Sequence, residues 1–266
     1  MKKIRFDIFD YYRFIDKMLL KINTNPEVYR SPDMCIASSD YTAEIMKTGL
    51  RIGKKNILVT GHPKTDNLLN YNISENCEIK EFFLKKYNLQ YEKLIYVAPT
   101  CRGDVTFDLF SSSFSFNEKI LSNLLEEIEA VIIFSFHPSD SHYLSNRRTF
   151  SSPRIFINYD YILDSYSLLH SASVLITDYS SLYSDFLLFD RPIVFSNFWH
   201  DQFLEKRELY SSYDSVTPGP KAEDWKEIQL SIEDILIKGI DQFKNERSLL
   251  IEKIYKFKDS KASQRV

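Results

Sequence analysis

A hydroxyl-rich corner between two apolar segments is the first feature of this sequence that could do chemistry. Residues 174–195 read VLITDYSSLYSDFLLFDRPIVF, a pattern that predicts a strand, a polar corner, a helix and a second strand. In a doubly wound sheet, a helix that begins at the carboxyl end of a strand points unpaired N–H groups at the ligand site. The hydroxyls of Thr177, Ser180 and Ser181 would add donors, so the corner could hold a phosphate. Helix capping by Asp178 or Ser180 is the alternative explanation, and it needs no ligand.

Other predicted strand ends carry side chains suited to phosphate chemistry. His137 follows the apolar run in FSFHPSD, and an imidazole can transfer a proton or carry positive charge beside a phosphate near neutral pH. Arg102 follows YVAPTC, and its guanidinium fork suits phosphate oxygens. The segment VTGHPKTDNLL at 59–69 adds His62. Each feature also has a simpler explanation. His137 could be a loop histidine without a role, and Arg102 a surface arginine paired with Asp104. The segment at 59–69 could be a structural turn.

Composition and charge limit the classes of protein to which the chain can belong. The chain has 266 residues, and its 44% hydrophobic content is enough for a buried core. It has 34 basic and 37 acidic residues and no dense basic tail, which argues against nucleic-acid binding. No apolar stretch approaches the roughly 18 to 20 residues that cross a bilayer, and no signal peptide is evident. We therefore expect a cytoplasmic protein, or one peripheral to the inner face of the cell membrane.

The spacing of cysteines and histidines indicates neither a disulfide framework nor a metal site. Cys35, Cys77 and Cys101 are widely separated and odd in number. The five histidines lack the HExxH spacing that places two ligands on one face of a helix. We expect no metal and no cofactor.

Short apolar runs alternate with segments of helical period, which predicts βα units and a parallel sheet of the α/β class. Most of the runs are nearly continuous in apolar character, as in strands covered on both faces. Strands are expected at 34–39, 57–60, 94–99, 131–136, 154–158, 174–177 and 193–196. Helices are expected at 11–22, 41–50, 79–87, 117–128, 165–172 and 181–189, and from Ser231 toward Lys256.

A polar segment without regular periodicity, LLNYNISENCE at 68–78, is the expected boundary between two sheet-containing parts. We expect a partial N-terminal Rossmann-like lobe at 1–75, a doubly wound Rossmann-like domain at 76–230 and a C-terminal helix at 231–266. The first part holds only two predicted strands and two predicted helices, which is too little for an independent sheet.

The segments GHPKTD, APTCRGD, FHP, LITDYSSLYSDFLLFDRPIVF and ELYSSYDSVTPGP occur in an order that resembles the CDP-glycerol glycerophosphotransferase family, the teichoic acid and capsule polymerases. The resemblance runs from about residue 2 to about residue 245 and is most specific in TDYSS. Lys64 stands where the family usually has arginine, and Cys101 where it usually has tryptophan.

The resemblance implies a GT-B-like enzyme that moves glycerol phosphate from CDP-glycerol to a hydroxyl of a lipid-linked polymer, with release of CMP. Such a transfer depends mainly on positioning and on spreading the developing phosphate charge. By position in the family, His137 would stabilise or protonate the departing phosphate, and TPGP at 217–220 would border the cleft. By the same resemblance, Ser180 and Ser181 would form a cradle for the pyrophosphate, and Asp185 would orient that cradle, with an internal bond between helix and loop as an equal alternative. The residues expected at the substrate site are Arg102, Thr177, Asp178, Ser180, Ser181 and Asp185, with Thr177 and Asp178 shaping the corner and His137 as the catalytic residue.

In the family, the first lobe carries a His-Gly motif that supplies a second histidine, expected as the general base. A sequence similar to KKIRFD follows that motif. Because this chain opens with MKKIRFD, the resemblance implies that it begins just after that motif. A truncated reading frame, a separate upstream chain that supplies the missing half-lobe, and a degenerate nucleotide-binding protein are the alternatives. The alternative functions are a non-catalytic nucleotide-binding subunit and a GT-B glycosyltransferase or epimerase with another nucleotide-activated donor.

Overall fold

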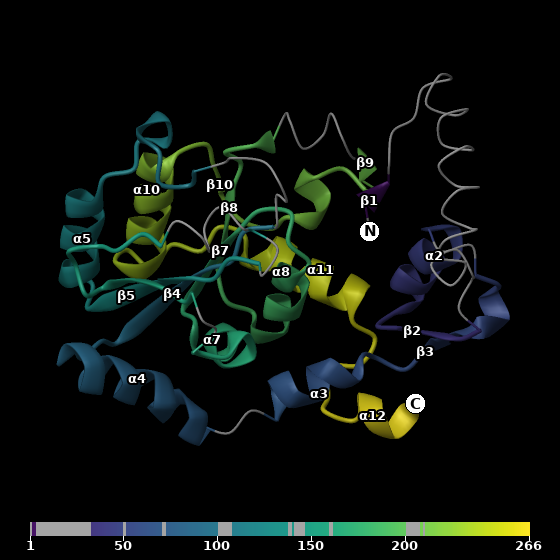
Figure 1. Ribbon diagram of the computed structural model, residues 1–266. Coiled ribbons are helices and arrows are strands. Elements are labelled where there is room, and N and C mark those ends of the chain that lie inside the picture. The colour runs from purple at the N-terminus through teal and green to yellow at the C-terminus, as the bar shows by residue number, and fades with distance from the viewer. Residues whose placement is uncertain are drawn as a thin grey trace, which may run out of the picture. The chain divides into compact units, whose positions relative to one another are not determined.

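The computed structural model describes residues 2–3, 33–49, 52–70, 73–100, 108–137, 140, 147–159, 162–200, 208–209 and 211–266 (Figure 1). The chain divides into two compact units. Unit 1 comprises residues 1–66, 199–216 and 252–266, and unit 2 comprises 67–198 and 217–251.

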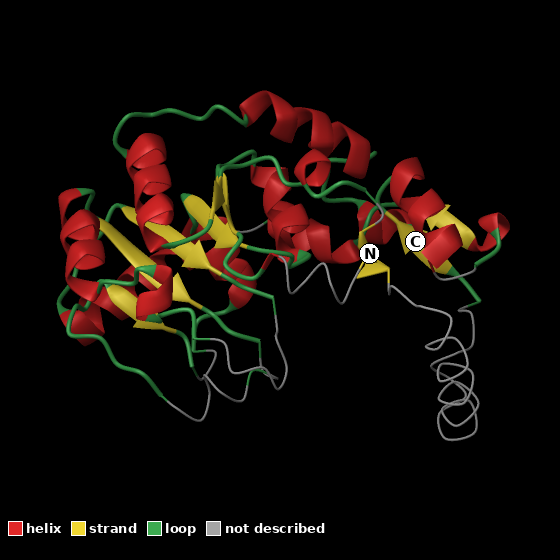
Figure 2. Cartoon of the chain, turned by 90° about the horizontal axis from the view of Figure 1, so that it is seen from above, coloured by secondary structure: helices red, strands yellow, loops and turns green. Residues whose placement is uncertain are grey.

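Unit 2 is built on a six-stranded parallel sheet with the order β10-β8-β7-β4-β5-β6 (Figures 1 and 2). The chain runs outward from β4 through β5 to β6, and then returns to place β7 on the other side of β4. The order of strands therefore reverses between β4 and β7, which is the switch point where doubly wound folds bind ligands. The strands are β4 (Lys93–Val97), β5 (Ala130–Phe134), β6 (Ile155–Ile157), β7 (Val174–Thr177), β8 (Ile193–Ser196) and β10 (Lys221–Ala222).

Helices cover both faces of this sheet, so its strands are buried on both sides. In Figure 1, α5 and α10 lie on one face, and α4 and α7 lie on the other. Every residue of β5, β7 and β8 is buried. The helices of unit 2 include α4 (Ile73–Tyr87), α5 (Glu118–Glu127), α7 (Ser165–Ser171), α8 (Leu182–Phe186) and α10 (Trp225–Leu236), while α11 (Lys244–Ile254) continues into unit 1.

Side-chain caps begin several of these helices. The side chain of Asn117 accepts a hydrogen bond from Ile120 N at the start of α5, and Asp164 accepts one from Ser167 N at the start of α7. The apolar stripe of α5, which includes Leu121 and Leu125, is buried.

Unit 1 contains a two-stranded parallel sheet of β2 (Cys35–Ala37) and β3 (Ile57–Val59), with α2 (Asp40–Gly49) between them in sequence. The C-terminal segment packs against it and ends in α12 (Ala262–Arg265). The carboxylate of Asp66, on α3 (Pro63–Leu69), accepts hydrogen bonds from Ala262 N and Ser263 N, both at 2.8 Å. Gly61 has φ of +83°, and a Cβ there would lie 3.2 Å from Ala262 Cβ, so this position requires glycine. In unit 1, β1 (Lys2–Lys3) and β9 (Glu208–Leu209) pair antiparallel.

The predicted strands are all present, although most are shorter than expected because the structured ladder ends before the apolar run does. The expected helix at 11–22 lies outside the described residues. At the expected boundary segment 68–78, α3 extends to Leu69 and α4 begins at Ile73, and the two compact units divide just before it, between residues 66 and 67.

The expected start of the last helix at Ser231 was also wrong. The helix α10 begins at Trp225, where Asp224 Oδ1 accepts a hydrogen bond from Glu227 N at 3.0 Å. Trp225 is fully buried, and its Nε1 donates to Leu109 O at 2.8 Å, so tertiary packing fixes this start. Gly239, with φ of +67°, separates α10 from α11.

The two compact units divide the chain differently from the expected boundaries at 75 and 231, because residues 199–216 and 252–266 belong to unit 1. The expected division into two lobes and a C-terminal helix as separate domains stays a prediction. Within the described ranges, no helix combines the length and the apolar character needed to span a membrane.

Candidate active site

Strand register brings the predicted site residues to one edge of the sheet. Val97 of β4 pairs with Phe134 of β5 and with Ile176 of β7, so the carboxyl ends of the three strands are level. Since β4 lies between them, β5 and β7 are about 10 Å apart. His137 and Ser180 each follow their strand by three residues, at this same edge. The imidazole of His137 is exposed, and His137 O accepts a hydrogen bond from Asp140 N at 2.8 Å.

Thr177 and Asp178 lie in the interior at this edge, and both are 0% exposed. Thr177 Oγ1 donates to Ala98 O at 2.7 Å. Asp178 Oδ1 accepts hydrogen bonds from Thr100 N at 2.7 Å and Thr100 Oγ1 at 2.6 Å. It also accepts one from Tyr179 N at 2.6 Å. These bonds hold the corner to the end of β4; a contact of either residue with substrate stays a prediction.

Ser180 and Ser181 are the hydroxyl residues that face outward. Ser180 is half-buried, and its Oγ accepts a hydrogen bond from Leu182 N at 3.4 Å. Ser181 is exposed and stands at the N-cap of α8, yet its side chain makes no capping hydrogen bond. Capping therefore does not explain Ser181, whereas Ser180 bonds the first amide of α8, as a residue at a helix start can. Because α8 has five residues, its dipole is small, and binding of a phosphate by the serine hydroxyls stays a prediction.

The remaining predicted residues have different outcomes. Asp185 is buried on α8, one turn beyond Ser181, and its orienting role stays a prediction. Arg102 lies outside the described residues. His62 O accepts hydrogen bonds from Thr65 N and Thr65 Oγ1, which makes GHPKTD a helix start that also anchors α12 through Asp66. Among the described residues, no group of three or more His, Cys, Asp or Glu side chains could hold a metal ion.

The expectation that TPGP at 217–220 borders the cleft was wrong. Phe195 N donates to Pro220 O at 2.8 Å, and a Cβ on Gly219 would lie 2.0 Å from Ile193 O. Since Ile193 is the first residue of β8, this segment lies at the amino end of the strand, away from the serine corner. The close approach of Ile193 O explains the glycine at 219.

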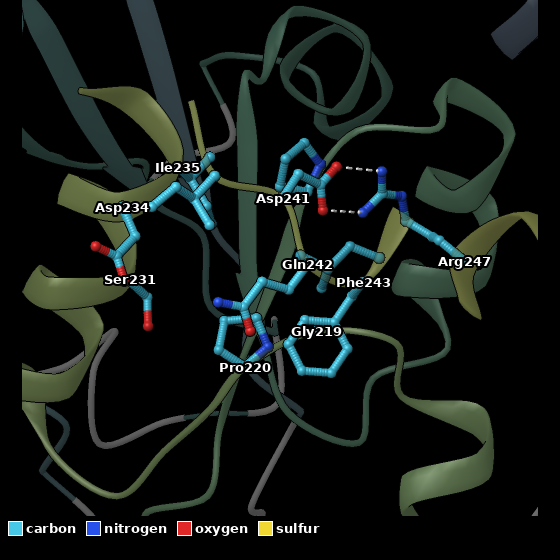
Figure 3. Close-up of a pocket in the computed structure, with 12 residues that line it drawn as sticks. Gly219, Pro220, Ser231, Asp234, Ile235, Asp241, Gln242, Phe243 and Arg247 are labelled. Atoms are coloured by element: carbon cyan, nitrogen blue, oxygen red, sulfur yellow. Dashed lines mark hydrogen bonds and ion pairs between the residues drawn. The ribbon is translucent and has the colours of Figure 1, made fainter. Parts of the chain in front are cut away.

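A cavity of about 90 Å³ lies beside that segment (Figure 3). It is bordered by Arg247, which is 1% exposed and forms a bidentate pair with Asp241. Typical ligand sites measure about 300–1,000 Å³, so this cavity is too small for a nucleotide. We interpret Arg247 as a structural clamp.

Thr100 is the residue of the site that sequence reasoning missed. It follows Pro99 at the end of β4, and its importance depends on the pairing of β4 with β7, which are far apart in sequence. A threonine at the end of a buried apolar run was the only available signal.

The comparison with known families identifies the family of this chain. A family model described as CDP-Glycerol:Poly(glycerophosphate) glycerophosphotransferase matches residues 2–266. The chain belongs to this family. Its expected GT-B-like α/β fold with parallel sheets is confirmed, and so is the resemblance drawn from the sequence.

Relatives in the glycerophosphotransferase family are longer than this chain. The chain is 25% identical over 244 residues to the teichoic acid ribitol-phosphate polymerase TarL of Staphylococcus aureus (strain NCTC 8325 / PS 47), covering 90% of this chain and 41% of TarL. It is 31% identical over 198 residues to the teichoic acid glycerol-phosphate primase of Bacillus subtilis (strain 168), covering 74% of this chain and 48% of the primase. A structure of a histidine variant of the wall teichoic acid polymerase TagF with CDPG matches with a TM-score of 0.68 and 28% identity, covering 92% of this chain and 59% of TagF. The chain thus spans about half the length of these relatives.

Proposed function

We propose that this chain binds CDP-glycerol, or a similar nucleotide-activated polyol phosphate, at the carboxyl edge of the unit 2 sheet. We further propose that it serves the transfer of glycerol phosphate to a hydroxyl of a teichoic-acid-type or capsule-type polymer. The observation that carries the proposal is the placement of His137 and Ser180 just beyond the carboxyl ends of β5 and β7, the two strands on either side of β4. Membership of the family and the similarity to TagF support it.

The transfer is an in-line displacement at phosphorus. The acceptor oxygen forms a bond to the phosphorus attached to glycerol, the bond from that phosphorus to the bridging oxygen breaks, and CMP leaves with that oxygen. Ser180 and Ser181 would donate hydrogen bonds to the pyrophosphate, and Arg102 would contact a phosphate or the acceptor. The exposed imidazole of His137 would stabilise or protonate CMP as it leaves. The acceptor proton passes to a base, which the resemblance assigns to a His-Gly motif that does not occur in residues 1–266.

The acceptor would be a lipid-linked polymer, so we place the reaction at the inner face of the cell membrane. This part of the proposal rests on the family resemblance. Sedimentation with vesicles that carry the acceptor tests it, and equal sedimentation with vesicles that lack the acceptor would contradict it.

The exposure of the small sheet in unit 1 supports the proposal of a further partner, an upstream polypeptide that completes this sheet. Of the residues in β2 and β3, only Ala37 is buried, whereas β5, β7 and β8 are buried throughout. Strands of parallel sheets are normally covered on both faces. Adding the part of TagF that this chain does not cover should slow hydrogen exchange in β2 and β3. Unchanged exchange in both strands would argue against such a partner.

Calorimetry with CDP-glycerol, followed by an assay of CMP release with a lipid-linked acceptor, tests the proposal. Replacing Ser180 and Ser181 together by alanine should weaken binding by roughly 1–3 kcal/mol, as for lost charge-assisted hydrogen bonds. Ser231→Ala is the matched control, because Ser231 Oγ donates to Glu227 O within α10. Unchanged affinity of the double variant would return the corner to a capping role.

The same measurements separate the alternatives. Binding of CDP-glycerol without CMP release in the presence of the acceptor would indicate a nucleotide-binding subunit. Preference for a UDP-sugar would indicate a GT-B glycosyltransferase or an epimerase.

A further inference from the structure

The strands that meet at the switch point stay joined beyond their last paired residues. Ala98 N donates to Ile176 O at 3.0 Å, which continues the ladder between β4 and β7. At the next residue of β7, a side chain makes the connection instead of the backbone: Thr177 Oγ1 donates to Ala98 O at 2.7 Å. At the next step Asp178 Oδ1 accepts two hydrogen bonds from Thr100. Side chains therefore extend the connection where the backbone ladder has ended.

At a switch point, the chains that leave neighbouring strands turn to opposite faces of the sheet and open a crevice between them. Here the carboxylate of Asp178 joins the segments that leave β7 and β4, because it accepts hydrogen bonds from Thr100. The residue has no exposed surface, so a ligand in the crevice would lie above it. On the β7 side, Ser180 follows Asp178 by two residues and is half-buried, whereas Tyr179 between them is buried.

The chemistry of a carboxylate explains why an acid occupies this position. Oδ1 of Asp178 accepts from two N–H groups and one O–H group at 2.6–2.7 Å. A carboxylate offers about four lone-pair sites, and charge-assisted hydrogen bonds are roughly twice as strong as neutral ones. A negative charge beneath a phosphate site would by itself repel the ligand. The bonding to Thr100 and Tyr179 is therefore the reason for the acid.

We propose that Asp178 is a positioning residue, whose carboxylate fixes the end of β4 to the β7–α8 corner and thereby sets the position of the Ser180 hydroxyl against the donor phosphates. This inference rests on the proposed function of the site. The hydrogen bond from Tyr179 N to Asp178 contributes to this positioning, because Tyr179 is the one residue between Asp178 and Ser180.

Double-variant binding measurements on the full chain test this role. Asp178→Asn keeps the shape but loses the charge, and it should weaken CDP-glycerol binding about tenfold. If Asp178 acts through Ser180, then Asp178→Asn should change affinity by less than about twofold when Ser180 is already alanine. A purely structural role would lower the melting temperature and leave the two effects on affinity additive.

Two variants of Thr100, one without and one with the hydroxyl donor, test the same role from the other side of the bond. They replace Asp178→Asn in the test if that variant does not fold. Thr100→Val removes only the hydroxyl donor and should weaken binding by about three- to fivefold, whereas Thr100→Ser keeps that donor and should bind as the wild type does. Additive effects of Asp178→Asn and Ser180→Ala, or equal affinities of the Thr100 variants, would overturn the positioning role alone. A wild-type chain that does not bind CDP-glycerol would refute the proposed function, and this inference with it.

Discussion

Removing the guanidinium of Arg247 is expected to lower stability without changing donor binding. Its terminal nitrogens lie 2.9 and 2.6 Å from the two carboxylate oxygens of Asp241 (Figure 3). Its Nε lies 3.0 Å from Asp190 Oδ1. Burial by itself lowers the pKa of Arg247, but the hydrogen bonds and charges of Asp241 and Asp190 outweigh this and raise the pKa above its ordinary value. The clamp is therefore charged throughout the working range of pH.

The magnitude follows from burial. Removing one partner of a buried ion pair costs about 3–5 kcal/mol, because the other charge is left uncompensated. The side chains of Asp241 and Asp190 are 26% and 41% exposed, so water can compensate part of their charge. We therefore expect Arg247→Ala to lower the free energy of unfolding by about 2–3 kcal/mol. Arg247→Lys should cost about 1–2 kcal/mol, since lysine keeps the charge but lacks the bidentate fork.

Urea unfolding gives the free energy, and Lys238→Ala is the control because it breaks an exposed pair with Asp234 that should contribute about 1 kcal/mol or less. The affinity for CDP-glycerol should not change, because Arg247 borders the cavity at the amino end of β8. The reasoning is refuted if Arg247→Ala costs no more stability than Lys238→Ala does.

Three further substitutions test separate parts of the structure. Thr177→Val should lower the free energy of unfolding by about 1–2 kcal/mol in urea titrations, because Ala98 O loses its bond, and a large drop in CDP-glycerol affinity by calorimetry would show that this bond also supports the donor site. His137→Ala should abolish CMP release while CDP affinity stays within a small factor, and loss of nucleotide binding would exclude a role confined to the transition state. Burial tends to raise the pKa of Asp66, but hydrogen bonds from the start of α12 and a nearby arginine hold that pKa below its ordinary value. The carboxylate therefore stabilises the docking of α12 above about pH 4, and this contribution is lost as the pH falls through the lowered pKa. Amide exchange at Ala262 should then be faster in Asp66→Asn at pH 7, and exchange at the wild-type rate would contradict this.

Much of the sheet could be predicted because its strands are buried on both faces. An apolar run such as 131–136 has no polar face, and a short run of this kind between helical segments predicts a buried strand. The start of α10 could not be predicted in the same way, since both Asp224 and Ser231 are suitable capping residues. The burial of Trp225 against Leu109 decides between them, and that contact joins residues 116 positions apart.

The site was predictable to the extent that it depends on strand ends. The rule that ligands bind at the carboxyl ends of parallel strands predicts from the sequence alone that His137 and Ser180 lie at one edge of the sheet. The bond between Asp178 and Thr100 could not be foreseen, because it requires β7 to return beside β4. The position of TPGP was mistaken for a related reason, since its place depends on where β10 joins β8.

A crystal structure of this chain with CDP-glycerol is the most direct test of the donor site. We predict that the pyrophosphate lies within hydrogen-bonding distance of the Ser180 or Ser181 hydroxyl, with the imidazole of His137 directed at the same group. A nucleotide bound at the amino end of the sheet, or within unit 1, would contradict the assignment.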